Sequence, residues 1–206
     1  SGIQQIALPL LILDMTGSGT IMGTFVLITN LPRLIFSPFA GVIGDRFDRK
    51  KIMIYMDFAR GFIILSLAFF EHFGALSMTV LFISQFFVST LDILFDPATS
   101  GMLGDIVPPE KLNRANSVIQ GVNSFSYIVG PALGGVLYGL LGIKIVFIAN
   151  GISFIVSAIS EFFISYKQTT TKGKITIKSV FCDMFEGFTF LKKISGLIML
   201  LMFAMF

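Results

Sequence analysis

The sequence predicts an all-α, polytopic membrane protein built as a six-helix transmembrane bundle, and three observations predict it. Of the 206 residues, 54% are hydrophobic and 13% are charged, whereas soluble domains carry about 25% charged residues. The mean hydropathy is +0.87. Long apolar segments alternate with short connections rich in Gly, Pro or charge, as expected for turns between membrane helices. These observations exclude a soluble enzyme, a disulfide-stabilised secreted domain and a disordered chain.

The apolar segments follow one another along the whole chain, and a spanning helix needs about 20 residues. They are Ile3–Leu13, Ile21–Ile43, Ile52–Phe73, Leu76–Leu103, Ser117–Leu141, Ile143–Ser165 and a run from Gly196 to Phe206. Because the first and last are too short to span, we expect a fragment truncated at both ends. Residues 1–166 are the expected bundle with an incomplete first span, residues 167–195 a linker, and residues 196–206 the start of a seventh span.

The positions of Lys and Arg predict the orientation, because cytoplasmic connections are enriched in these residues. Twelve of the 15 basic residues lie in 46–51, in 111–114 or in 167–193, so these connections are expected in the cytoplasm. Apolar residues recur at helical spacing over 176–193, which predicts an amphipathic helix at the membrane surface. It would serve either as a strut between two bundles or as a regulatory site.

The connection after the second segment holds a dense set of charges, Gly-Val-Ile-Gly-Asp-Arg-Phe-Asp-Arg-Lys-Lys. Its first glycine would let two helices approach closely. The first acid in it can pair with a base or stabilise a helix N-terminus. The pattern predicts an ionic latch that holds one conformation closed, and the alternative is a basic turn that only fixes topology. The latch residues are Gly41, Asp45, Arg46, Arg49 and Lys50.

The fifth segment carries glycines at helix-packing spacing. Gly130 and Gly134 form one pair of small residues four apart, and Gly135 and Gly139 form another, which predicts close helix contacts. Pro131 removes a backbone hydrogen bond and permits a bend. The alternative is packing of a kind common to many membrane helices.

Charged residues inside apolar segments are costly in a bilayer, so each is a functional candidate. They are Arg33, Asp57, Arg60, Asp92 and Asp96. Counting residues from the cytoplasmic ends at 1.5 Å each predicts that Arg33 pairs with Asp92. The same count predicts that Arg60 pairs with Asp96 or with Asp57. Asp92 and Asp96 are candidates for proton or cation coupling, because a carboxylate taken out of water binds a proton more readily. The alternative is that the charges form static ion pairs.

Polar residues at helical spacing on the fifth segment predict one wall of a cavity, with Gln120, Asn123 and Tyr127 as lining candidates. Hydrogen bonding between helices is the alternative.

One cysteine and one histidine, Cys182 and His72, are too few for a metal site. No phosphate-binding glycine loop or catalytic triad is present in the sequence, and we expect no enzymatic activity. The scattered net charge of +3 gives no reason to expect nucleic acid as a partner.

The motifs resemble those of the major facilitator superfamily. Gly41-x-x-x-Asp45-Arg46-x-x-x-Lys50-Lys51 resembles the family's motif A, with Asp48 in place of its usual glycine. Gly121 followed by Gly130-Pro131-Ala132-Leu133-Gly134-Gly135 resembles the antiporter motif. The wider pattern, including Gln5-Ile6-Ala7-Leu8-Pro9 and Leu31-Pro32-Arg33, is similar to the macrolide-efflux and enterobactin-exporter branch.

This resemblance implies the N-terminal half of a twelve-helix transporter in the cytoplasmic membrane of a bacterium. It implies export of drugs or other amphipathic small molecules by alternating access, driven by a proton gradient and without a cofactor. The partners it implies are the substrate, the lipid bilayer and the missing C-terminal half. The alternatives are an uptake symporter of the same fold and a non-transporting membrane scaffold or receptor.

Overall fold

The computed structural model describes residues 2–166, apart from the side chains of Pro38, Val42, Asp45 and Arg46. The expected linker 167–195, its amphipathic helix and the start of a seventh span lie outside the described residues. Within residues 2–166 the chain is helical and contains no strand. The elements are α1 (Gly2–Thr16), α2 (Gly19–Arg46), α3 (Arg49–His72), α4 (Met78–Ile106), the short 3₁₀ helix η1 (Pro109–Lys111) and α5 (Leu112–Phe162).

The starts of three helices are fixed by local sequence signals. Ser18, Asp48 and Ser77 precede α2, α3 and α4, and each side chain accepts a hydrogen bond from the backbone N–H three residues later, at 3.2–3.4 Å. Such N-caps satisfy backbone donors that the helix itself leaves unpaired. Each of the six predicted segments that lie within the described residues overlaps a helix along most of its length.

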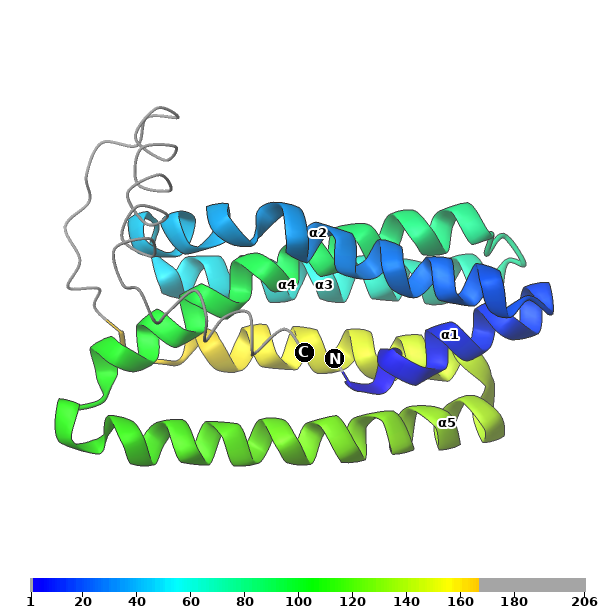
Figure 1. Ribbon diagram of the computed structural model, residues 1–206. Coiled ribbons are helices and arrows are strands. Elements are labelled where there is room, and N and C mark those ends of the chain that lie inside the picture. The colour runs from blue at the N-terminus through cyan, green and yellow to red at the C-terminus, as the bar shows by residue number, and fades with distance from the viewer. Residues whose placement is uncertain (1, 167–206) are drawn as a thin grey trace, which may run out of the picture.

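The 51-residue helix α5 contains the predicted fifth and sixth segments as two arms, residues 112–141 and 143–162. Gly142 between them has φ +79°, a left-handed conformation that glycine adopts without steric cost. The second arm therefore folds back along the first, as Figure 1 shows at the turn near the label α5.

The helices form one bundle in which α3 packs against α4 and α5, α2 packs against α4, and α1 packs against α5. The largest cluster of buried apolar side chains includes Ile12, Ile64, Leu81 and Phe147. Helices α2, α3, α4 and α5 contain stretches long and apolar enough to cross a membrane.

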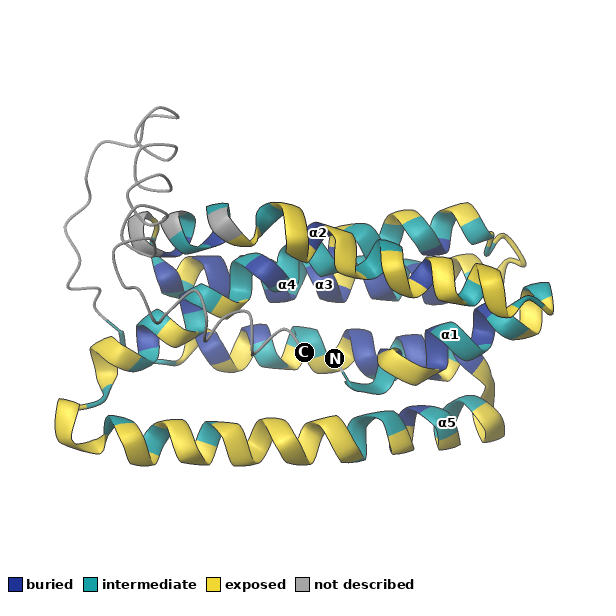
Figure 2. Cartoon of the chain, viewed as in Figure 1, coloured by how far each residue is buried: buried dark blue, intermediate teal, exposed yellow. Residues whose placement is uncertain are grey.

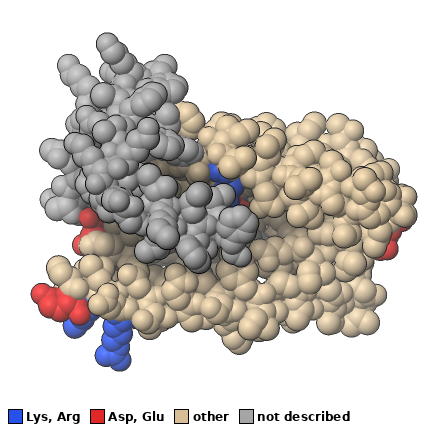
Figure 3. Space-filling view, in the orientation of Figure 1, with Lys and Arg blue, Asp and Glu red and all other residues tan. Residues whose placement is uncertain are grey.

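The outside of the bundle is apolar. Many large hydrophobic side chains are exposed, among them Leu34, Phe62, Ile128 and Leu140. Figure 2 shows exposed residues along α2 and along the first arm of α5. On the face in Figure 3, charged atoms lie mainly at the two ends of the molecule. An apolar belt between charged ends is the surface expected of a protein whose surrounding solvent is lipid.

Candidate functional site

A cavity of about 520 Å³ opens among α1, α2, α4 and the first arm of α5, with Arg60 of α3 also in its lining. Its wall combines apolar side chains, amides, hydroxyls and charged groups. The lining residues are Gln4, Gln5, Leu8, Pro9, Phe25, Val26, Thr29, Asn30, Arg33, Arg60, Gln85, Val88, Ser89, Asp92, Ile93, Phe95, Asp96 and Tyr127. Most of the predicted intramembrane charges therefore face one shared space.

Of the three residues proposed from the fifth segment as cavity-lining candidates, the structure places one at this cavity. Tyr127 lines the cavity, whereas Gln120 and Asn123 are exposed on the first arm of α5 and do not. Gln120 lies seven residues before Tyr127, about 10 Å along the helix axis, and so misses the depth of the cavity. Gln4 and Gln5 of α1 were missed, although polar side chains in an apolar segment are a usable signal.

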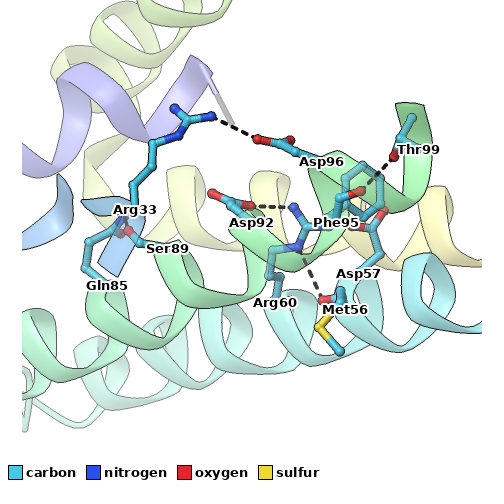
Figure 4. A network of polar contacts seen from close by, with 10 residues as sticks. All are labelled: Arg33, Met56, Asp57, Arg60, Gln85, Ser89, Asp92, Phe95, Asp96 and Thr99. Carbon is cyan, nitrogen blue, oxygen red and sulfur yellow. Dashed lines mark hydrogen bonds and ion pairs between the residues drawn. The ribbon is translucent and has the colours of Figure 1, made fainter. Parts of the chain in front are cut away.

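Arg60 is the centre of a buried charge network (Figure 4). Its guanidinium forms ion pairs with Asp57 on the same helix and with Asp92 on α4. Its Nε donates a hydrogen bond to the carbonyl oxygen of Met56 at 3.3 Å. The side chains of Arg60 and Asp57 are only 5% and 3% exposed, whereas that of Asp92 is 38% exposed. Asp92 thus joins the buried network to the cavity.

Two aromatic rings complete the environment of Arg60. The guanidinium carbon lies 4.3 Å from the ring centroid of Phe95 and 4.9 Å from that of Phe154. The faces of aromatic rings attract cations, most strongly where water is excluded. The charge of Arg60 is therefore held in place by two carboxylates and two rings.

Arg33 and Asp96 form a separate and more open ion pair. Arg33 Nη2 lies 2.9 Å from Asp96 Oδ2, and the two side chains are 67% and 58% exposed. The predicted pair Arg33–Asp92 is wrong, because Arg33 pairs with Asp96 and Asp92 pairs with Arg60. The prediction that Arg60 pairs with either Asp96 or Asp57 is confirmed for Asp57.

The difference between the predicted and the observed ion pairs has a geometric cause. Asp92 and Asp96 are four residues apart, about 6 Å along the helix, and an arginine side chain is long enough to bridge that difference. Depth alone therefore cannot choose between them. The direction in which each carboxylate points decides, because α4 packs against both α2 and α3 and presents Asp96 to the first and Asp92 to the second.

Arg49 is the basic residue of the predicted latch with the most contacts that the structure describes. Its side chain is buried; Nη1 lies 2.7 Å from Asp105 Oδ2, and Nε donates to the Gly44 carbonyl oxygen at 3.1 Å. Tyr166 donates its hydroxyl to Asp105 at 2.5 Å. Burial, together with this hydrogen bond, raises the pKa of the Tyr166 phenol. Asp105 and Tyr166 were not identified as functional candidates from the sequence.

The other members of the predicted latch are placed differently. Lys50 Nζ donates to the carbonyl oxygen of Phe162 at 2.9 Å, which ties the start of α3 to the end of α5. The side chains of Asp45 and Arg46 lie outside the described residues. The described residues show no close helix approach at Gly41, where a β-carbon would meet no other described residue within 4 Å, whereas Gly44 packs against Pro97 of α4.

Comparison with known proteins decides the family. The sequence model of the Major Facilitator Superfamily matches residues 1–206, which is the full sequence. The chain belongs to the major facilitator superfamily.

Relatives of this major facilitator chain include proteins named as exporters. It is 29% identical over 206 residues to macrolide efflux protein A of Streptococcus pyogenes, covering 98% of the chain and 50% of that protein. It is 29% identical over 176 residues to macrolide efflux protein A of Enterococcus faecalis, covering 84% of the chain and 53% of that protein. It is 32% identical over 168 residues to the uncharacterized MFS-type transporter YfiS of Bacillus subtilis, covering 79% of the chain and 38% of that protein. The chain thus spans about half the length of the curated macrolide efflux proteins it matches.

The antiporter-type glycines of this major facilitator chain lie partly at a helix contact. Gly130 and Gly134 pack on the backbone of Gly2 and Ile3 in α1, where a β-carbon on Gly130 would lie 2.8 Å from the Gly2 Cα. A β-carbon on Gly134 would overlap the Ile3 carbonyl oxygen. The predicted close packing at these two glycines is confirmed.

The contact does not extend along the whole motif. A β-carbon on Gly135 would make an ordinary contact of 3.9 Å with Ile6, and no described atom lies near Gly121 or Gly139. The expected second close pair, Gly135 and Gly139, is therefore wrong for the described part of the chain. Pro131 lies inside α5, between the two tightly packed glycines.

Replacing Gly134 by Leu is expected to lower the free energy of unfolding of the bundle by at least about 1–3 kcal/mol, because the side chain would force α1 away from α5. The thermal unfolding midpoint of the full-length protein in detergent measures this. Gly139→Leu is the matched control, since its surroundings among the described residues are open. Equal midpoints for the two variants would contradict the packing observed at Gly134.

Proposed function

We propose that this chain forms one half of a proton-coupled exporter of amphipathic small molecules that works by alternating access. The observation that carries the proposal is the cavity of about 520 Å³ that combines apolar walls with the carboxylates of Asp92 and Asp96. In such a transporter two bundles rock about a site near the middle of the membrane. The second bundle would be supplied by the part of the relatives' length that this chain does not cover.

The lining of the cavity supports an amphipathic substrate. Phe25, Val26, Val88 and Ile93 offer apolar contacts, while amides, hydroxyls and carboxylates offer a few polar ones. Ligand sites commonly combine a mostly apolar wall with a few placed polar groups that set orientation. Two relatives are named for macrolide efflux, and macrolides are therefore the first substrates to test.

The charged groups support coupling to protons. Asp92 and Asp96 reach the cavity, and each also contacts an arginine. A carboxylate in that position can bind a proton when the cavity opens to one side and release it when the cavity opens to the other. No cofactor is required, because the proton gradient supplies the free energy. Asp45, Arg46, Arg49 and Lys50 would form the conformational latch.

The surroundings follow from the same proposal. The apolar outer surface of the bundle would lie in a lipid bilayer, which we infer to be the cytoplasmic membrane of a bacterium. The basic connections near Arg49 and Lys111 would face the cytoplasm. The partners would be the transported molecule, lipid and the second bundle, with no role for nucleic acid.

Transport by the full-length protein in everted membrane vesicles tests this function. With an acidic vesicle interior, a radiolabelled macrolide is expected to accumulate inside, and a protonophore is expected to abolish the accumulation. Vesicles without the protein provide the background. Proton-driven movement in the opposite direction would indicate an uptake symporter. The absence of gradient-driven movement of macrolides and of a panel of amphipathic cations would indicate a scaffold or receptor.

A further inference from the structure

The acidic residue nearest the end of α5, Glu161, is buried without an obvious role in the cavity. Its residue surface is only 7% exposed, and its Oε2 has no hydrogen-bond partner among residues 2–166. Its carboxyl group interacts electrostatically with the carboxyl group of Asp57, and the Ser157 hydroxyl lies close to both. Two carboxyl groups thus meet in the interior of the bundle, away from the lining of the cavity.

Helix α3 packs closely against the second arm of α5 near Asp57. A β-carbon on Gly61 would lie 3.2 Å from the Gly151 carbonyl oxygen, and one on Gly151 would lie 3.3 Å from the Gly61 carbonyl oxygen. Backbones this close leave no room for water between the helices at these two glycines, and Glu161 is buried as well, with 7% of its surface exposed. Asp57 lies one turn before Gly61 on α3 and is 2% exposed.

The charges around the two carboxyl groups do not balance if every acid is ionised. Among the described residues, the charged groups that face them are Arg60 from α3 and Asp92 from α4. Lys50 donates instead to the carbonyl oxygen of Phe162. One guanidinium therefore stands against three carboxyl groups, those of Asp57, Asp92 and Glu161.

We propose that Asp57 and Glu161 form a second proton-binding site, in which the two carboxyl groups share one proton between α3 and the second arm of α5. Two carboxylates side by side in a dry environment cannot both ionise without a large cost. The shared proton turns one of them into a donor to the other. It also removes the cost of an ionised oxygen atom, Glu161 Oε2, that accepts no hydrogen bond.

Arg60 links this shared proton to the cavity. The same guanidinium contacts Asp57 and Asp92, so the two carboxylates compete for its charge. When Asp92 binds a proton, the charge of Arg60 acts on Asp57 alone and favours ionisation of the pair. Proton binding at Asp92 and proton binding by the pair are therefore expected to oppose each other.

Infrared spectroscopy of the full-length protein in detergent tests the shared proton without substrate or gradient. The unmutated protein is expected to keep a carboxylic acid C=O band at neutral pH, and Glu161→Gln is expected to remove it. Glu110→Gln is the matched control, because Glu110 is exposed in η1, and it should leave the band unchanged. A band of full intensity in a folded Glu161→Gln protein, or no band in the unmutated protein, would overturn the proposal.

Two further variants keep the test decisive if Glu161→Gln does not fold. Asp92→Asn is expected to move the pH midpoint of the band down by roughly one unit, because removal of a neighbouring negative charge favours ionisation. Ser157→Ala is expected to move the midpoint up, because the ionised pair loses a hydroxyl donor. Unchanged midpoints in both variants would contradict the proposal. Because the readout needs no transport, its failure would leave the proposed export function standing.

Discussion

Arg60→Leu is expected to destabilise the protein by about 3–5 kcal/mol, because removal of the guanidinium leaves the buried carboxylate of Asp57 without its counter-ion. The side chains of Arg60 and Asp57 are 5% and 3% exposed, so water cannot replace the lost partner. Asp57 would have to bind a proton or the helices would have to separate. The thermal unfolding midpoint of the full-length protein in detergent measures the loss.

Arg33→Leu is the matched control for this prediction. Arg33 also pairs with an aspartate, but the two side chains of that pair are more than half exposed. Exposed pairs contribute roughly 0–1 kcal/mol, so this variant should unfold close to the unmutated protein. The double variant Asp57→Asn with Arg60→Leu should recover part of the stability, since it removes the stranded charge. Equal unfolding midpoints for Arg60→Leu and Arg33→Leu would show that the buried network stabilises the protein no more than the exposed ion pair does.

Asp92→Asn is expected to abolish transport of substrate driven by the proton gradient while leaving the protein folded. The asparagine cannot take up and release a proton, so the step that links the gradient to the cavity is lost. The cost in stability should be roughly 1–3 kcal/mol, the range for a hydrogen bond to a charged group. It should be smaller than for Arg60→Leu, because Arg60 keeps Asp57 and two aromatic rings.

The readouts for Asp92→Asn are transport in everted vesicles and the unfolding midpoint. Asp92→Glu is the conservative control, because it keeps a titratable carboxyl group on the same helix position and should retain part of the coupled transport. Facilitated movement of substrate down its own gradient should survive in Asp92→Asn, since the walls of the cavity are unchanged. If this variant still transported substrate at the full rate with the proton gradient as driving force, Asp92 would not be the coupling residue.

The sequence predicted the local features of the fold well. The positions of α2, α3 and α4 follow from their apolar runs, and the structure adds the caps Ser18, Asp48 and Ser77, which act within a few residues of the chain. The break between the fifth and sixth segments was also predicted, and in the structure the backbone leaves the helical conformation at Gly142, between the two arms of α5. The sequence also identified the charged residues inside the membrane segments, because a charged residue within a long apolar run is rare.

The partners of those charges were decided by tertiary packing. The sequence gives the depth of Arg33, Arg60, Asp92 and Asp96 through the fixed rise of a helix, but it does not give the rotation of one helix against another. Asp105 and Glu161 were passed over because each lies near the end of its segment, where an acid usually faces water. Their roles depend on which residues α3 and α5 bring to the same place: Arg49 beside Asp105, and Asp57 beside Glu161. The sequence by itself determined that the chain is a membrane bundle with charges inside it, whereas only the packing of its helices determined which charges meet.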